Sequence, residues 1–359
     1  MADSKQAPLD AEAAAKAAFA SVQNQPFPND IFTAPELRWA VIGCGVIANQ
    51  MAQSLALAGR KLAGVANRTL SKAQAFAEQY GVEKVYETVE DLYADPDIDA
   101  VYITTPHNTH ITYLRAALAA GKHVLCEKAI TLNSAELDEA RAIADEHNVV
   151  LMDATTVLHM PLYQELRRRM DAGDFGRMNL AQLNFGSHKE YGDLTNRFYN
   201  RSLAGGAMLD IGVYALSVMR LFMASQPVEV VSLGNTCETG VDVAGGIVCR
   251  NAEQQLGVVS LTLHSKQPKR SVISFDKCYI EVNEYPRADH ATIVWTADGH
   301  REEVAAGTEA YALCYEMADL EQAVAGDDSK CELLDYASDV MELMTKLRAD
   351  WGVVYPEEE

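Results

Sequence analysis

Short apolar runs alternate with helical segments from Leu37 to Met152. Strand-like runs lie at 37–42, 61–66, 84–87, 100–104, 123–126 and 149–152. A segment of helical character follows each of the first five. Strands that alternate with helices form a parallel sheet with crossover helices, and ligands bind beyond the carboxyl ends of its strands. The sequence therefore predicts an α/β fold that begins with a doubly wound domain.

The first of these strands runs directly into the turn GCGVIA, residues 43–48. Gly43 suits a tight turn, Gly45 lets the backbone approach a pyrophosphate, and Ala48 stands where helix and strand pack closely. Glycine-rich turns are common, but this one opens an alternating strand–helix pattern and so predicts dinucleotide binding. The expected contacts are Gly43, Gly45, Val46 and Ile47.

Two later strand ends carry polar groups. The run 100–104 leads into TTPHNTH, where the histidines either contact the ribose and nicotinamide or are incidental to a helix start. The expected contacts in this loop are Thr104, Thr105, Pro106, His107 and His110. The run 123–126 ends in Glu127 and Lys128, which are costly to bury. Either they form an ion pair that reaches solvent, or this strand end faces something that needs a cation; both residues are candidate cofactor contacts.

The residues after the second strand bear on which nicotinamide is used. An acidic residue there bonds the adenosine ribose and repels a 2′-phosphate. Here the position holds Asn67, followed by Arg68, with Lys72 at the start of the next helix. A guanidinium pairs well with phosphate. These three residues favour NADP over NAD, although Asn67 can also bind a plain ribose and Arg68 can simply be solvated.

The pattern changes after Met152. A helical segment at 161–173 precedes strand-like runs at 178–185, 229–234, 245–250, 256–263, 271–276, 278–283 and 291–296. Near-consecutive strands separated by turn residues predict a large, mostly antiparallel open sheet. A free sheet face makes a homo-oligomer, dimer or tetramer, plausible. A closing helix at 331–352 is expected to pack back on the first domain.

Between these strands lies LAGGAMLDIGVYALSVMRL, residues 203–221. The two glycines open a helix on which Asp210 and Tyr214 are spaced i, i+4 on one face. On its own this pair fits a core helix with a buried tyrosine ring at least as well as it fits a site.

Together these motifs resemble the glucose–fructose oxidoreductase, inositol dehydrogenase and rhizopine catabolism family (Gfo/Idh/MocA), in order and spacing, from Leu37 to GVVYPEE near the end. The resemblance implies a Rossmann domain followed by an α+β domain. It also implies a catalytic site made of Lys128, Asp210 and Tyr214. A tyrosine at 214, in place of histidine, resembles the branch that includes dihydrodiol dehydrogenases and glucose–fructose oxidoreductase.

Two positions depart from the family pattern. Ala129 replaces the proline that usually follows the catalytic lysine, and Leu158 stands where that branch carries an arginine. The substrate of relatives therefore cannot be assumed for this chain.

Composition excludes several classes of protein. With 30 basic and 51 acidic residues the net charge is -21, which repels nucleic acid and anionic lipid. The sequence contains no run of about 18 apolar residues, so it predicts no membrane span. Seven cysteines without a C-x-x-C pattern indicate a reduced, cytoplasmic protein without a structural metal.

The sequence thus predicts three parts: an arm at 1–36 with a short amphipathic helix, lying on a partner subunit; a Rossmann domain at 37–154; and a substrate and oligomerisation domain at 155–359. The expected function is NAD(P)-dependent hydride transfer with a secondary alcohol, hemiacetal or carbonyl of a sugar-like or diol molecule. A tyrosine, with a reference pKa of about 10, is a weak base that a nearby ammonium can activate. The alternatives are a redox-inactive cofactor-binding sensor and a glycosidase that uses tightly bound NAD.

Overall fold

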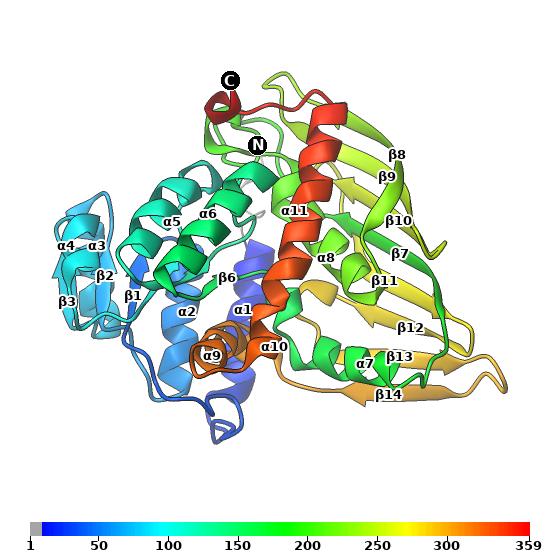
Figure 1. The fold of residues 1–359 in the computed structure, drawn as a ribbon, viewed down its shortest axis with the longest axis horizontal. Helices are drawn as coiled ribbons and strands as arrows, with labels where there is room; N and C mark the ends of the chain where they lie inside the picture. Colours follow the sequence, from blue (N-terminus) through cyan, green and yellow to red (C-terminus); the bar gives the residue numbers. More distant parts are fainter. Residues whose placement is uncertain (1–8) are drawn as a thin grey trace, which may run out of the picture. The chain divides into compact units, whose positions relative to one another are not determined.

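The computed structural model describes residues 9–359, and the chain divides into two compact units, coloured by sequence in Figure 1. Unit 1 contains the residues up to 131, 135–154 and 310–335, and unit 2 contains 132–134, 155–309 and 336–359. The main division falls after residue 154, and the domain bounds expected from the sequence stay a prediction. The return of 310–335 to unit 1 was not expected, since the sequence analysis placed all of 155–359 in the second domain.

Unit 1 is built on a six-stranded parallel sheet in the order β3-β2-β1-β4-β5-β6. Its strands are β1 (Trp39–Ile42), β2 (Gly64–Ala66), β3 (Lys84–Tyr86), β4 (Ala100–Ile103), β5 (His123–Cys126) and β6 (Leu151–Asp153). Every strand falls within or overlaps an expected run. This order places a topological switch point between β1 and β4, where such sheets bind ligands.

The crossover helices are α2 (Val46–Leu57), α3 (Leu70–Tyr80), α4 (Val89–Ala94), α5 (His110–Ala119) and α6 (Ser134–His147). All five were expected, with ends displaced by a few residues. Residues 1–8 of the arm lie outside the described residues, and the rest contains α1 (Leu9–Val22), in agreement with the expected helix. Ala18 and Val22 of this helix pack in a small core with Tyr311 of the same unit. The expected position of the arm on a partner subunit stays a prediction.

Helix α9 (Ala312–Val324) belongs to the core of unit 1 although it follows the second sheet in the sequence. Leu313, Met317 and Leu320 lie in one buried cluster with residues of β1 and α2. Glu321 of α9 is almost completely buried. Its Oε1 accepts a hydrogen bond from the indole N–H of Trp39 at 3.0 Å, and its carboxylate pairs with the Arg60 guanidinium.

Unit 2 is built on an eight-stranded sheet in the order β14-β13-β12-β11-β7-β10-β9-β8. Its strands are β7 (Met178–Gly186), β8 (Pro227–Thr236), β9 (Asp242–Asn251), β10 (Leu256–Thr262), β11 (Gln267–Phe275), β12 (Cys278–Asn283), β13 (His290–Trp295) and β14 (Arg301–Ala305). Only β7 and β10 pair in parallel; the other neighbours are antiparallel, as expected. The edge strand β14 was not anticipated.

Helices cover one face of this sheet in Figure 1: α7 (Pro161–Asp171), α8 (Val213–Phe222) and α11 (Leu333–Asp350). From residue 336 onward α11 belongs to unit 2, where Arg220 of α8 pairs with Asp339 at 2.6 Å. The closing helix was expected to pack back on the first domain, whereas most of α11 is grouped with unit 2; the segment grouped with unit 1 is 310–335, which contains α9. The helical run Arg201–Phe222 is long and apolar enough to cross a membrane, but 83% of its most apolar window is buried in the protein, as in a core helix.

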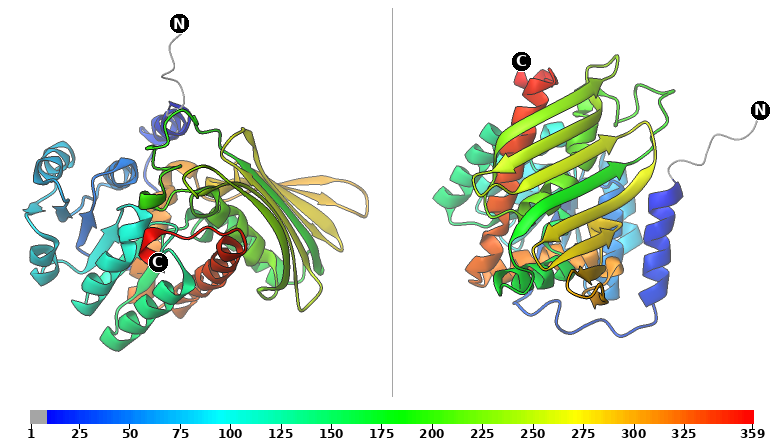
Figure 2. Two further views of the ribbon diagram at one scale, coloured as in Figure 1. Left: turned by 90° about the horizontal axis from the view of Figure 1, so that it is seen from above. Right: turned by 90° about the vertical axis from the view of Figure 1, so that its right-hand side faces the viewer.

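The opposite face of the sheet carries no helix of unit 2, and Figure 2 (right) looks onto it. Exposed apolar side chains gather at its β8 end, where Val231 pairs with Val248 of β9. Leu233, two residues along β8, is 83% exposed. The patch formed by Val231, Leu233, Val248 and Leu256 is called the β8 patch below.

Candidate active site

The glycine turn after β1 leaves room for a ligand at the start of α2. Gly43 has a φ of +103°, and its N–H donates to Ala66 O at 2.9 Å. A Cβ on Gly43 would lie 2.7 Å from Thr104 Oγ1, so a side chain does not fit there. A Cβ on Gly45 would meet no atom within 4 Å, and no side chain caps α2. Open backbone N–H groups at a helix N-terminus bind anions, so this turn fits a pyrophosphate.

The residues that follow β2 are those expected to meet an adenosine ribose. The Asn67 side chain is half-buried and its Nδ2 donates to Thr69 O at 3.0 Å. Arg68 and Lys72 are exposed. The Lys72 ammonium lies within electrostatic reach of the Cys44 thiol in the glycine turn, although burial dominates and raises the pKa of that thiol to about 11. Positive charge therefore borders the glycine turn.

The loop after β4 is closed by its own hydroxyl groups. The Thr104 N–H and hydroxyl both donate to Ile42 O, at 2.9 and 3.0 Å. The Thr109 hydroxyl, just before α5, donates its one hydrogen either to Pro106 O at 2.7 Å or to Thr105 Oγ1 at 2.8 Å, and it does not cap the helix. These bonds hold the loop against the end of β1, beside the glycine turn.

The structure bears on the question of Glu127 and Lys128 at the tip of β5. The Glu127 side chain is only 8% exposed; its Oε1 accepts a short hydrogen bond from the Tyr102 hydroxyl, and its Oε2 accepts the Lys128 N–H at 3.3 Å. Lys128 is half-buried. The peptide bond from Lys128 to Ala129 is cis. The glutamate thus faces inward to β4, and the lysine follows the strand at the ligand-binding edge of the sheet.

Two histidines hold the backbone that follows Lys128. His107 Nε2 lies 3.0 Å from Lys128 O. His110 Nδ1 lies 3.1 Å from Ala129 O, and its Nε2 lies 2.8 Å from Thr105 O. His110 is fully buried, and burial lowers its pKa. A neutral imidazole carries one N–H, so His110 donates to only one of these two carbonyl groups at a time. The structure thus gives both histidines a contact with the loop around Lys128; their contact with cofactor stays a prediction.

The two remaining predicted catalytic residues lie on one helix of unit 2. A π-helical turn, Met208–Gly212, precedes α8 and contains Asp210. Such turns are rare and occur often at functional sites. Asp210 is 8% exposed, while Tyr214 is half-buried with its ring centroid 6.1 Å from that of Phe185. The sequence analysis expected a regular i, i+4 pair on one α-helix, whereas Asp210 lies in the π-turn and Tyr214 in α8.

Arg197 is a contact of Asp210 that the sequence analysis did not identify. Its Nη2 lies 3.4 Å from Asp210 Oδ1, and its guanidinium lies over the Phe198 ring. The Arg197 side chain is 60% exposed, so this pair is weak. Arg197 lies in the long connection between β7 and the helix. A single arginine in a connection belongs to no sequence motif, so no signal in the sequence could have identified it.

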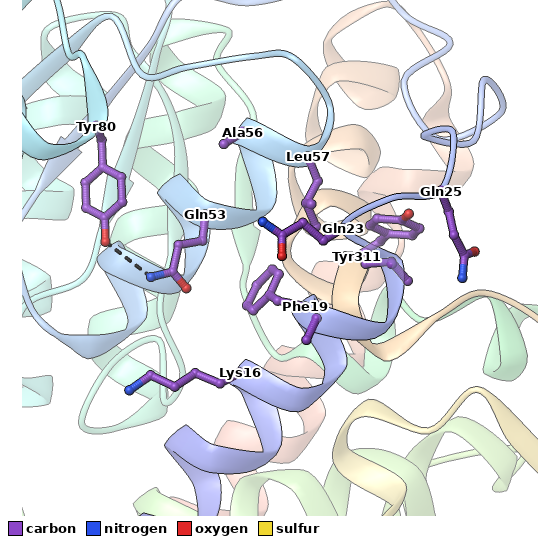
Figure 3. Close-up of a pocket in the computed structure, with 11 residues that line it drawn as sticks. Lys16, Phe19, Gln23, Gln25, Gln53, Ala56, Leu57, Tyr80 and Tyr311 are labelled. Atoms are coloured by element: carbon purple, nitrogen blue, oxygen red, sulfur yellow. Dashed lines mark hydrogen bonds between the residues drawn. The ribbon is translucent and has the colours of Figure 1, made fainter.

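Two other features do not add to the site. Within residues 9–359 no group of three or more histidine, cysteine or acidic side chains is arranged to hold a metal ion. A pocket of about 490 Å³ lies between α1 and α2 (Figure 3). It is lined by residues that include Phe19, Gln53 and Tyr311, and none of the eleven drawn was predicted to bind ligand.

The parallel sheet, the open glycine turn and the lysine after β5 define a dinucleotide-binding oxidoreductase. Comparison with known proteins gives the family. Residues 37–155 match the model of the oxidoreductase family with an NAD-binding Rossmann fold, and residues 163–281 match the GFO/IDH/MocA C-terminal domain. The chain belongs to the Gfo/Idh/MocA oxidoreductase family, which confirms the resemblance seen in the sequence.

Individual relatives add detail. The trans-1,2-dihydrobenzene-1,2-diol dehydrogenase of Mus musculus is 31% identical over 69% of this chain and 75% of its own length. KijD10, a 3-ketoreductase from Actinomadura kijaniata solved with NADP and TDP-benzene, is 25% identical, with a TM-score of 0.75 over 88% of this chain and 98% of its own. A levoglucosan dehydrogenase solved with NADH and levoglucosan shares the fold, at 20% identity and a TM-score of 0.76 over 87% of this chain and 97% of its own.

Proposed function

We propose that this enzyme oxidises a secondary alcohol of a diol or sugar-like small molecule, or reduces the corresponding carbonyl, with a nicotinamide dinucleotide. The observation that carries the proposal is that Lys128 follows β5 at the same carboxyl edge of the sheet as the glycine turn after β1. The mouse relative acts on a diol, and KijD10 is a ketoreductase. Both names fit chemistry at a carbinol carbon.

Three side chains would manage the proton. Removing a hydride from a carbinol carbon requires that the hydroxyl proton leave, and Tyr214 is the proposed acceptor. The Lys128 ammonium would stabilise the tyrosinate or polarise the substrate oxygen directly. Asp210 would orient a substrate hydroxyl or the lysine. In the reverse direction, Tyr214 returns the proton to the alkoxide.

The cofactor would be held by residues whose geometry is described above. The N–H groups of Val46 and Ile47, which follow Gly45 in the first turn of α2, would bind the pyrophosphate. The loop from Thr104 to His110 borders the same turn. When bound, the nicotinamide supplies or accepts the hydride.

A preference for NADP over NAD follows from the residues after β2. A 2′-phosphate would find the neutral Asn67 together with Arg68 and Lys72, both exposed cations. A guanidinium and an ammonium stabilise a phosphate dianion, whereas a carboxylate at this position would repel it. The KijD10 structure contains NADP and the levoglucosan dehydrogenase structure contains NADH, so relatives use either form.

Absorbance of the reduced nicotinamide tests the reaction. The enzyme is supplied with NADP or NAD and with a panel of trans-diols, polyols and aldoses, and the reverse reaction with the matching carbonyl compounds. We expect stoichiometric reduction of added cofactor with at least one diol or sugar. Cofactor that binds without turnover on the whole panel would favour a sensor, and catalysis without net cofactor consumption would favour a glycosidase.

The cofactor preference has its own test. The ratio of kcat/KM for NADP to that for NAD is measured for the wild type and for Asn67→Asp. We expect the ratio to exceed 1 in the wild type and to fall by about tenfold or more in the variant, because a carboxylate would face the 2′-phosphate. Glu78→Gln on the same helix as Lys72 serves as a control, since its exposed side chain lies two turns away.

We also infer a homo-oligomer formed through the free face of the large sheet, in a reducing, cytoplasmic compartment. The β8 patch is exposed and apolar, which favours burial against a second copy. All seven cysteines are free thiols, which fits a reducing environment. Sedimentation velocity of the wild type and of Leu233→Glu tests the interface: the variant should sediment as a smaller species.

A further inference from the structure

A buried carboxyl group contacts the helix that carries two of the proposed catalytic residues. Asp242 is the first residue of β9 and is completely buried. Its Oδ2 accepts the N–H of Met208 at 2.6 Å, at the first residue of the π-turn. Its Oδ1 is buried and makes no hydrogen bond within residues 9–359. No neighbouring side chain caps the start of this helix, and the Asp242 carboxyl group, which lies on β9, caps it instead.

The approach of this carboxyl group depends on a glycine. Gly206 has a φ of +126°, and a Cβ there would lie 2.3 Å from Asp242 Oδ1. The N–H of Gly206 donates to Phe198 O at 2.9 Å, and Gly206 O accepts the N–H of Asp210 at 3.3 Å. The turn that opens the helix is thus enclosed on the side of β9.

The segment after α11 holds the same turn from another side. The Tyr355 hydroxyl donates to Gly205 O at 2.7 Å. The Arg348 guanidinium lies over the Tyr355 ring, 4.7 Å from its centroid, and pairs with Glu358 at 2.8 Å. The helix start is therefore held at Gly205 by Tyr355 and at Met208 by Asp242.

We propose that Asp242 is a positioning residue for the reaction: its carboxylate fixes the first turn of the helix so that Asp210 and Tyr214 keep the orientation that catalysis needs. Asp210 is only two residues beyond the N–H that Asp242 holds. A displaced helix start would shift both side chains together. This inference rests on the proposed function, because it assigns Asp242 a role through those two residues.

The surroundings of Asp242 make this contact sensitive to pH. From the helix start, the N–H groups of Met208 and Ala207 favour its ionised form; from α11, the Arg348 guanidinium does the same. From the segment after α11, the Tyr355 ring lies against that guanidinium and Glu358 pairs with it. Burial outweighs these groups and raises the pKa of Asp242 to about 6. Near that pH the carboxyl group takes up a proton and becomes a weaker acceptor for Met208.

The test uses Asp242→Ala, Asp242→Asn and a control in the same strand. Asn251 lies at the other end of β9, is equally buried and bonds to Gln255, so Asn251→Ala removes a comparable buried contact far from the helix start. Three quantities are measured: amide hydrogen exchange of peptides covering 205–214, kcat with the Kd for cofactor, and the pH profile of kcat.

We expect Asp242→Ala to increase exchange in 205–214 and to lower kcat by about 10- to 100-fold, with cofactor Kd changed by less than about twofold. Asn251→Ala should leave exchange in 205–214 and kcat within about twofold of the wild type. In the wild type we expect kcat to decline below pH 6. Asp242→Asn retains an oxygen acceptor but does not titrate, so this decline should be absent in the variant.

Unchanged exchange in Asp242→Ala, or an unaltered acid limb in Asp242→Asn, would overturn the proposal. Hydrogen exchange needs no substrate, so it reports on Asp242 even if the wild type turns over nothing on the diol and sugar panel. If Asp242→Ala does not fold, the exchange of 205–214 in the wild type and Asp242→Asn across pH 5 to 7 decides instead: only the wild type should lose protection locally below pH 6.

Discussion

The two units hold their proposed catalytic groups by different means. In unit 1, Lys128 lies on a loop after β5, and the ring nitrogens of His107 and His110 contact the carbonyl groups of that loop. In unit 2, Asp210 and Tyr214 lie on a helix, and the start of that helix is held by an acidic side chain, Asp242. One support consists of imidazole rings, and the other is a carboxyl group.

Proposed catalytic side chains can thus be positioned by groups of opposite chemistry, an imidazole in unit 1 and a carboxyl group in unit 2. These two groups respond in opposite ways to protons and to substitution. Loop carbonyl groups need a donor, which an imidazole provides. The N–H groups of a helix start need an acceptor, which a carboxylate provides. Substitutions in each unit should therefore separate chemistry, support and stability.

Lys128→Met should produce the largest effect. We expect turnover to fall by about 10²- to 10⁴-fold because the ammonium is lost, while cofactor binding persists. Lys122 precedes the same strand and donates to the carbonyl groups of Asp95 and Ile98, so Lys122→Met should reduce stability and spare kcat. Near-normal kcat in a folded Lys128→Met would return Lys128 to a structural role.

Tyr214→Phe should come next, with a loss in kcat of about 10²- to 10³-fold and little change in Tm, because the ring remains and only the hydroxyl is removed. Tyr163→Phe is the matched control. The Tyr163 hydroxyl is buried and donates to Tyr285 O at 2.7 Å, so this variant should lose about 1 kcal/mol of stability and keep its activity. A Tyr214→Phe enzyme that loses Tm rather than kcat would identify Tyr214 as a core residue.

His110→Asn should lower kcat by about tenfold and also lower Tm, since carbonyl groups of Thr105 and Ala129 lose their buried donor. His147, which is exposed at the end of α6, provides the control: His147→Gln should change neither quantity. Retention of full activity in His110→Asn would show that the loop around Lys128 keeps its conformation without the imidazole.

The smallest effect should come from pH, and it should have opposite signs in the two units. Burial lowers the pKa of His110 and His123 in unit 1. The unfolded chain therefore binds more protons as the pH falls below about 6.5, and unit 1 should lose stability. In unit 2 the pKa of Asp242 is raised to about 6, so the folded state binds the proton more tightly and unit 2 as a whole should gain stability from pH 7 to pH 5.

Hydrogen exchange of core amides in each unit at the two pH values measures this contrast. Core peptides of α8 and β10 should become better protected at pH 5, although the start of the helix loosens locally as its cap weakens. Because the two contributions oppose each other, the change in Tm of the whole protein should be smaller than either. Parallel loss of core protection in both units would contradict the prediction.

The sequence predicts unit 1 better than unit 2 for a physical reason. Buried parallel strands are short apolar runs that alternate with helices, so β5 was located at the observed residues and the glycine turn followed from its spacing. The strand β14, REEVA, lies at a sheet edge with mostly polar side chains and gives no such signal. The assignment of α9 to unit 1 depends on packing against residues far away in the sequence.

The contacts of Asp242 and Tyr355 with the helix start could not be predicted from the sequence for the same reason. The contact of Asp242 with Met208 joins residues 34 positions apart, and the contact of Tyr355 with Gly205 joins residues 150 apart. No local spacing encodes such contacts. The motifs predicted which groups meet ligands, whereas the residues that contact the backbone around those groups could be found only from the fold.

The return of α9 to unit 1 has a consequence for how the protein is made. Trp39 in the first strand finds Glu321 as its partner only after 282 further residues have been synthesised, since synthesis runs from the N-terminus. Until then Leu313, Met317 and Leu320 are not available to pack against the apolar residues of α2. Unit 1 therefore cannot complete its core until the whole large sheet has been translated. Such long-range contacts slow folding and expose the chain to aggregation and chaperone binding.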